Sequence, residues 1–94
     1  MNAKPLAENL RDANEAGINL LISDSQIALT LLDAAEVSSD METRSRRIGA
    51  ARKAYDTIHH LRRRLTLDEA QSNTLDEQMS TLRKRLIHAG VLGE

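Results

Sequence analysis

The stretch SDMETRSRRIGAARKAYDTIHHLRRRL, residues 39–65, decides the fold, because it combines a helix start, an apolar stripe and most of the positive charge. Ser39 and Glu42 stand three residues apart, the spacing of a capping box, so we expect a helix to begin at about Asp40. Apolar residues then recur at three- and four-residue steps, which places them on one side of the helix. They are Met41, Ile48, Ala51, Tyr55, Ile58, Leu61 and Leu65. The stretch predicts an amphipathic helix over about 40–65.

A long helix is predicted upstream of this stretch, over about 5–37. Pro5 suits the first turn of a helix, because the N–H that proline lacks would have no partner there. Apolar residues follow it at helical steps. Gly17 and Asn19 are poor interior helix residues, so a break between Gly17 and Asp24 is the alternative. We favour one continuous helix, since no proline interrupts this region.

A third helix is predicted downstream, over about 69–89. Asp68 and Gln71 have the spacing of a capping box, and Gly90 stands where a left-handed residue commonly ends a helix. Apolar residues between these signals repeat at four- and three-residue steps. They are Leu75, Met79, Leu82, Leu86 and Ala89.

The second half of the first helix is apolar on two faces. One stripe runs through Leu20 and Ile27, and another runs through Leu21 and Ala28. A helix of this kind needs two neighbours, so we expect both stripes to be buried. Short connections between helices make consecutive helices antiparallel. The sequence therefore predicts an all-α fold, an up-down-up three-helix bundle with a long first helix, as a single domain over 1–94.

Composition limits the classes of protein that this chain can belong to. Ninety-four residues form one small domain, and 40% apolar residues with a single aromatic one predict a thin, aliphatic core. The chain has no cysteine, which excludes a disulfide or a catalytic thiolate and favours the cytoplasm. The longest apolar run, at 20–22, is too short to span a bilayer, and acidic residues near the N-terminus do not resemble a signal peptide.

Positive charge is concentrated in one segment although the net charge is only −1. Residues 40–65 sum to about +5, between acidic segments of about −4 and −2. Once the apolar stripe is removed, the outward face of this helix holds Arg46, Lys53, His60 and Arg64. Such a face is a candidate interaction surface for an acidic partner or a phosphate backbone. The sequence lacks a helix-turn-helix pattern and aromatic stacking residues, so nucleic-acid binding is the alternative function rather than the leading one.

Metal and catalytic sites are not expected. His59 and His60 are adjacent on a helix and point about 100° apart, so they cannot hold one ion together. Asp56 and His60 could supply two ligands, whereas a protein site needs three or four. The sequence contains no Gly-rich phosphate loop and no serine or cysteine catalytic set. We therefore expect no cofactor and no enzymatic activity.

Two segments resemble known helical hairpins. GAARKAYDTIHHL, preceded by DSQIALTLLDAAE, resembles a tetratricopeptide-type or microtubule-interacting-and-trafficking-type hairpin over about residues 24–65. The run RIGAARKAYDTI also resembles part of short bacterial three-helix proteins with no assigned function. The resemblance implies an adaptor or scaffold that binds a helix or an extended peptide between its own helices. It assigns no binding residue.

Two further expectations concern the first helix. Because it is longer than its partner, Leu6 and Leu10 should lack cover within the chain, and burial in a two-fold homodimer would remove this exposed patch. Asp24 falls at a stripe position, at about the height of Tyr55. We expect a buried polar pair in which the Tyr55 hydroxyl donates to Asp24 or to a serine beside it. The alternative is that Asp24 turns to solvent.

Overall fold

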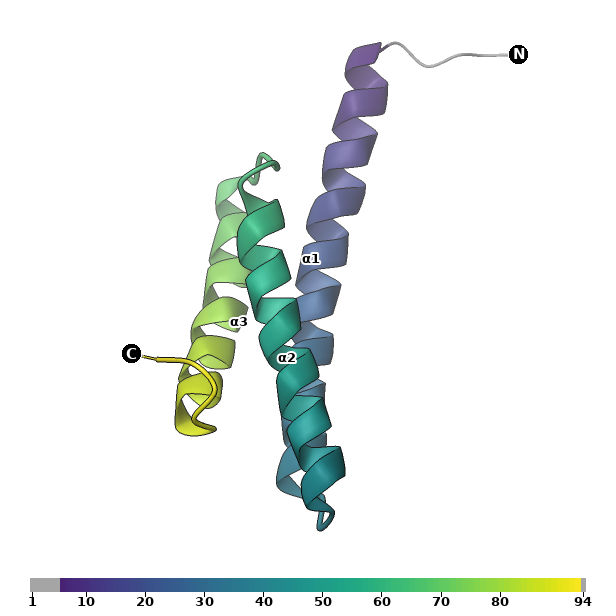
Figure 1. The fold of residues 1–94 in the computed structure, drawn as a ribbon. Helices are drawn as coiled ribbons and strands as arrows, with labels where there is room; N and C mark the ends of the chain where they lie inside the picture. The colour runs from purple at the N-terminus through teal and green to yellow at the C-terminus, as the bar shows by residue number, and fades with distance from the viewer. Residues whose placement is uncertain (1–5, 94) are drawn as a thin grey trace, which may run out of the picture.

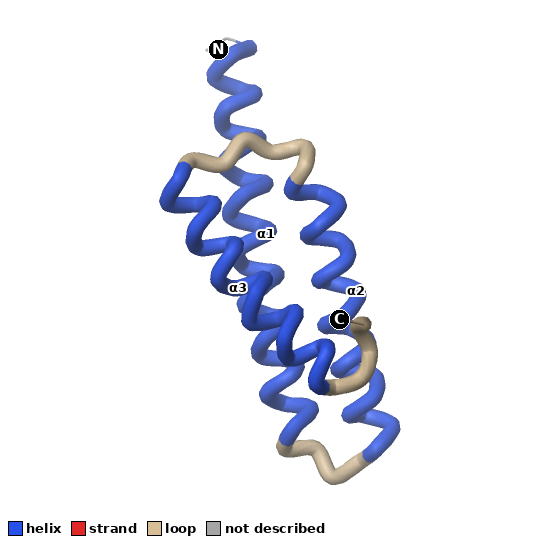
Figure 2. Tube along the Cα trace, turned by 90° about the vertical axis from the view of Figure 1, so that its left-hand side faces the viewer, coloured by secondary structure: helices blue, strands red, loops and turns tan. Residues whose placement is uncertain are grey.

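A computed structural model describes residues 6–93, which form three helices and no strand (Figure 1). The helices are α1 (Leu6–Glu36), α2 (Met41–Arg62) and α3 (Glu69–His88). Two short connections reverse the chain, so α1 and α3 run in one direction and α2 runs in the other (Figure 2). The predicted up-down-up bundle with a long first helix is confirmed. The α1 helix is continuous, as favoured over a break.

The start of α2 differs from the prediction by one residue. Asp40, not Ser39, is the N-cap, and its carboxylate accepts a hydrogen bond of 3.0 Å from the N–H of Thr43. The predicted capping box of Ser39 with Glu42 is therefore wrong. Aspartate caps a helix as well as serine does, and here it stands one position closer to the apolar stripe.

The ends of α3 follow the sequence signals. The N–H of Gln71 donates to Asp68 Oδ1 at 2.8 Å, and the N–H of Asp68 donates to Gln71 Oε1 at 3.0 Å, which confirms the capping box. Gly90 has a φ of 80°, a left-handed conformation that glycine adopts without strain. The N–H of Val91 then donates to the carbonyl of Leu86 at 3.2 Å, which closes a Schellman motif.

The core is aliphatic and is organised around α1. This helix packs against both others, whereas α2 and α3 contact each other least. The central position in the bundle therefore belongs to α1. The core cluster consists of Leu21, Ala28, Leu32, Ala51, Tyr55, Ile58, Leu75, Met79, Leu82 and Leu86.

Only one of the two apolar stripes of α1 is buried. Leu21 and Ala28 lie in the core with 1% and 0% of their surface exposed, whereas Leu20 and Ile27 are each 57% exposed. The expectation that both stripes are buried is therefore wrong. Adjacent positions on a helix point about 100° apart. The stripe through Leu21 and Ala28 packs against both α2 and α3, so the stripe through Leu20 and Ile27 is left exposed to solvent.

The first two turns of α1 extend beyond the rest of the molecule. α1 has 31 residues and α2 has 22, a difference of about 14 Å at 1.5 Å per residue. The side chain of Asn14 marks where the overhang begins, because its amide donates to the carbonyl of Thr66 and its oxygen accepts from the N–H of Thr66, both at 2.8 Å. Residues 6–13 therefore project past the α2–α3 connection, as Figure 1 shows.

Candidate interaction surfaces

A seam of positions at alternating four- and three-residue steps runs along α1 outside the core. We call it the α1 seam, and it consists of Leu6, Leu10, Ala13, Gly17, Leu20, Asp24, Ile27 and Leu31. Four of its side chains are large, apolar and more than half exposed: Leu6 (74%), Leu10 (62%), Leu20 (57%) and Ile27 (57%). Steps of this kind place residues on one face of a helix, the pattern that pairs helices in coiled coils.

The α2 helix forms a second wall beside the middle of the seam. A cavity of about 210 Å³ opens there, lined by Gly17, Leu20, Leu21, Leu61, Arg64 and Leu65. Ala50 and Ala54 lie on the same side of α2 as Leu61, at steps of four and seven residues. The six lining residues form a shallow, mostly apolar groove between α1 and α2 that is open to solvent. Ala50 and Ala54 continue the α2 side of this groove with small side chains.

Gly17 allows Leu65, in the turn that follows α2, to come close to α1 at one end of this groove. A Cβ atom built on Gly17 would stand 2.9 Å from Leu65 Cδ2, so the Leu65 side chain occupies the space that any larger residue would use. Leu65 can reach this position because α2 ends at Arg62 and the chain then turns. The predicted end of this helix at about residue 65 is therefore three residues too late.

The sequence located part of the α1 seam and missed its centre. Leu6 and Leu10 lack intrachain cover, as expected, and the homodimer inferred from them remains a prediction. The spacing of Leu20 and Ile27 predicts that they are buried, whereas both are exposed in the structure. Asp24 is the feature of the sequence that could have indicated this exposure, because a charged residue within a stripe indicates that the stripe faces solvent for at least part of its length.

The basic face of α2 contains three of the four predicted residues. Arg46, Lys53 and His60 are exposed at seven-residue steps on one side of the helix. Arg64 is exposed in the turn after the helix and lines the apolar groove instead. Arg46 reaches Thr43 of its own helix, at 3.4 Å. Within residues 6–93, Lys53 and His60 have no ion-pair partner at 4 Å or less.

Several other arginines of the chain are already held in intramolecular contacts. Arg52 pairs with Asp56 at 3.0 Å, and Arg62 pairs with Asp76 at 2.5 Å. Arg47 donates to the carbonyl of Ala34 at 3.1 Å. Arg62 joins α2 to α3 and Arg47 joins α2 to α1, whereas the Arg52–Asp56 pair lies within α2. The two ion pairs neutralise part of the basic charge of α2. The positive potential available to a partner is therefore smaller than the sequence suggested.

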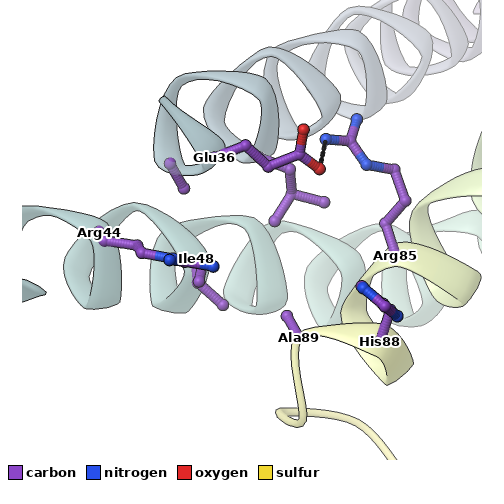
Figure 3. Close-up of a pocket in the computed structure, with 8 residues that line it drawn as sticks. Glu36, Arg44, Ile48, Arg85, His88 and Ala89 are labelled. Carbon is purple, nitrogen blue, oxygen red and sulfur yellow. Dashed lines mark hydrogen bonds and ion pairs between the residues drawn. The ribbon is translucent and has the colours of Figure 1, made fainter. Parts of the chain in front are cut away.

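A small polar cleft lies where the end of α1 meets α2 and the end of α3 (Figure 3). Its volume is about 180 Å³, and it is lined by Leu32, Ala35, Glu36, Arg44, Ile48, Arg85, His88 and Ala89. Arg85 points toward Glu36, with its Nη2 atom 3.0 Å from Glu36 Oε1, and its Nη1 atom lies 2.8 Å from Asp33 Oδ1. The two acids pair with α3 because α3 packs on the side of α1 that carries them.

The two neighbouring acids raise the pKa of the Arg85 guanidinium. Partial burial acts to lower its pKa, but the hydrogen bonds that it donates to Asp33 and Glu36 and the negative charges of these two carboxylates outweigh burial, so the pKa is raised. Arg85 stays positively charged at all physiological pH values and is neutralised by two acids. This cleft is therefore a structural junction between α1 and α3 rather than a free anion site.

The predicted polar pair is not formed in the structure. Asp24 is half-buried and has no hydrogen bond to Tyr55 within residues 6–93, and the Tyr55 ring makes an edge contact with His59 at a centroid distance of 5.0 Å. Ser25, one position along, is the buried polar residue of the described core. Its hydroxyl contacts the carbonyl of Ile22 at 2.7 Å and the side-chain oxygen of Gln78. The polar link thus joins α1 to α3 rather than to α2.

The described residues show no constellation of metal ligands. No group of three His, Cys, Asp or Glu side chains between residues 6 and 93 could hold an ion. Part of α1 is long and apolar enough to cross a membrane by length and composition alone, and 33% of that window is buried. Core helices of soluble proteins meet the same criterion, so this one helix is weak evidence for a span.

Comparison of the chain with protein-family models, with curated proteins and with solved structures found no match. The resemblance to tetratricopeptide-type and microtubule-interacting-and-trafficking-type hairpins stays a prediction. The features of the molecule that bear on function are the α1 seam, the groove beside it and the basic face of α2.

Proposed function

We propose that this protein is a small protein-interaction module without catalytic activity, which binds a partner helix along the α1 seam. The observation that supports this proposal is the row of four large apolar side chains, each more than half exposed, on one face of α1. Scattered single apolar residues on a surface are ordinary, whereas an aligned row marks an interaction site. The cytoplasmic location expected from the sequence remains a prediction.

The groove beside the seam suits a helix better than an extended peptide. Helical ligands anchor through side chains at three-, four- and seven-residue steps, which is the spacing of Leu20 and Ile27 and of the seam as a whole. Ala50 and Ala54 on the opposite wall allow the backbone of a bound helix to come close. An extended strand would require an exposed sheet edge, and residues 6–93 contain no strand.

Site-specific photo-crosslinking in the native cell tests this proposal. A photoreactive residue in place of Leu20 lies in the groove, whereas the same residue in place of Asn19 is exposed on a different face of α1. We expect a discrete covalent product through position 20 that is absent through position 19 and is lost when Ile27→Glu is added. Products of equal yield at both positions, or none at position 20, would contradict the proposal.

The alternative is a nucleic-acid accessory protein that binds through α2. One observation favours it, the exposure of Arg46, Lys53 and His60 on a single helix face. Phosphate contacts of this kind make affinity strongly dependent on salt. An electrophoretic mobility shift at low salt tests this alternative by comparing the unaltered chain with a variant that carries both charge reversals, Arg46→Glu and Lys53→Glu. Binding that is lost in the double reversal would favour this alternative, and no binding by the unaltered chain would remove it.

A further inference from the structure

We infer that the helix bound along the α1 seam is the α1 helix of a second copy of this chain, in an antiparallel two-fold dimer. This inference rests on the proposed function, because it names the occupant of the same groove. It follows from three features. The seam residues pair with one another when the helix is reversed, the uncovered overhang of one copy fits beside α1 and α2 of the other, and the charges of α1 and α2 are opposite.

The seam matches itself when it is reversed. Pairing the eight positions from opposite ends sets Leu6 against Leu31, Leu10 against Ile27, Ala13 against Asp24 and Gly17 against Leu20. A two-fold interface has this property, because residue i of one copy contacts residue j of the other while j contacts i. The paired seam covers about 26 residues of each α1, or about 39 Å at 1.5 Å per residue.

The same register brings the exposed overhang of one copy against the exposed part of the seam around Ile27 in the other. It lays the overhang of one copy, residues 6–13, along residues 24–31 of the other. Two contacts fix the height of α2 at that level: Arg47 reaches the carbonyl of Ala34, and Leu65 lies over Gly17. These contacts place Ala50 and Ala54 beside the same part of α1. The overhang would therefore lie between residues 24–31 of α1 and the small side chains of Ala50 and Ala54, next to the cavity at Gly17 and Leu20 rather than inside it.

A parallel arrangement of the two α1 helices is disfavoured by Asp24. In parallel register the two Asp24 carboxylates would meet at the same level of an apolar seam, where like charges repel. In the antiparallel register Asp24 lies opposite Ala13, whose small side chain leaves the carboxylate a path to water. Asp24 thus favours the antiparallel over the parallel arrangement of the two α1 helices.

Charge also favours the antiparallel pair. The overhang and the turn after it carry Glu8, Asp12 and Glu15 against one base, Arg11. The α2 segment at the height of the groove presents Lys53, exposed and without an ion-pair partner at 4 Å or less within residues 6–93. These acids lie on faces of α1 turned away from the seam, so the dimer brings a net acidic end of one copy near a basic part of the other without a direct ion pair. With a net charge of −1, two copies repel each other only weakly.

Charge exchange at one predicted contact tests the inference on the full chain. The unaltered chain should scatter light with twice the chain mass at high micromolar concentration. Leu10→Lys alone and Ile27→Glu alone should each raise the dissociation constant roughly 100-fold or more, because each dimer loses two apolar contacts. Mixing the two variants should restore a dimer, because each mixed pair joins one new lysine to one new glutamate and keeps one Leu10–Ile27 contact.

Two matched variants control for charge and for helix stability. Ala7→Lys and Gln26→Glu change the same charges at exposed positions one to three residues away, on other faces of α1, and should leave the dimer intact. All the altered side chains are exposed, so circular dichroism should show unchanged helicity. A monomer at every concentration, or a failure of the mixed variants to associate, would overturn the inference. A monomer that still crosslinks through Leu20 to another protein would leave the proposed function standing and remove only the second copy as the partner.

Discussion

Ser25 places a hydroxyl in the contact between α1 and α3, with none of its surface exposed. Its oxygen lies beside the side-chain oxygen of Gln78 and the carbonyl of Ile22. We expect Ser25→Ala to lower the free energy of unfolding by about 1–3 kcal/mol, because the Gln78 oxygen then lacks a partner in a partly buried site. Urea denaturation measures this loss.

A double-mutant cycle separates the hydrogen bond from simple packing. Gln78→Leu in the Ser25→Ala background removes both polar groups, and apolar contact then replaces the hydrogen bond. The double variant should lose less stability than the sum of the two single variants. Additive losses would show that the two side chains do not interact.

Asn14 fixes the α2–α3 connection to α1 through its two hydrogen bonds with the backbone of Thr66. Asn14→Ala should lower the free energy of unfolding by about 1 kcal/mol, because both bonds are lost at an exposed site. The Thr66 amide should also exchange its hydrogen faster. Asn19→Ala, at an exposed position of the same helix, provides the control and should have a smaller effect. Equal effects of the two substitutions would contradict the role assigned to Asn14.

At the scale of single elements, two glycines lie inside helices in different surroundings. A Cβ atom on Gly49 of α2 would meet nothing within 4 Å, whereas one on Gly17 of α1 would press on Leu65. Gly49→Ala should raise the free energy of unfolding by about 0.5–1 kcal/mol, the usual gain in a helix interior. Gly17→Ala should gain less or lose stability, because Leu65 must move. Equal gains in thermal melts would show that Leu65 is not packed at Gly17.

The start of α2 should make stability depend on acid pH. Hydrogen bonds from the Thr43 side chain and from the Thr43 backbone lower the pKa of Asp40 below its ordinary value of 3.8. A depressed carboxyl pKa stabilises the fold at pH values above 3.8, and this contribution is lost as the pH falls through the lower, folded-state pKa. The stability difference between the unaltered chain and Asp40→Asn should therefore shrink in that acidic range. A difference that is independent of pH would contradict this assignment.

At the scale of the whole molecule, local signals predicted the elements well. The capping box of Asp68 with Gln71 and the left-handed Gly90 are formed as expected, because each depends on residues within one turn. The apolar repeat of α3 is likewise buried at Leu75, Leu82 and Leu86. Three helices with short connections then leave few possible arrangements, which is why the up-down-up fold was predictable.

The choice between the two stripes of α1 was not predictable, because both are aliphatic and both have helical spacing. The packing of α3 decides it: Ser25 meets Gln78, and Arg85 reaches Asp33 and Glu36, so the Leu21 stripe turns inward. These contacts join residues about 50 positions apart in the sequence. The exposed Leu20 and Ile27, and with them the candidate site, follow from that tertiary packing.

Cysteine crosslinking offers the most direct test that the α1 seam joins two copies of the chain. The chain contains no cysteine, so Leu10→Cys and Ile27→Cys introduce the only thiols. Mild oxidation of the mixed single variants should give a disulfide-linked dimer rapidly, because the antiparallel register sets these positions opposite each other. Each variant alone should crosslink slowly, because its two identical thiols would lie about 25 Å apart at 1.5 Å per residue. Rapid crosslinking of Leu10→Cys with itself, or no crosslinking of the mixture, would contradict the account.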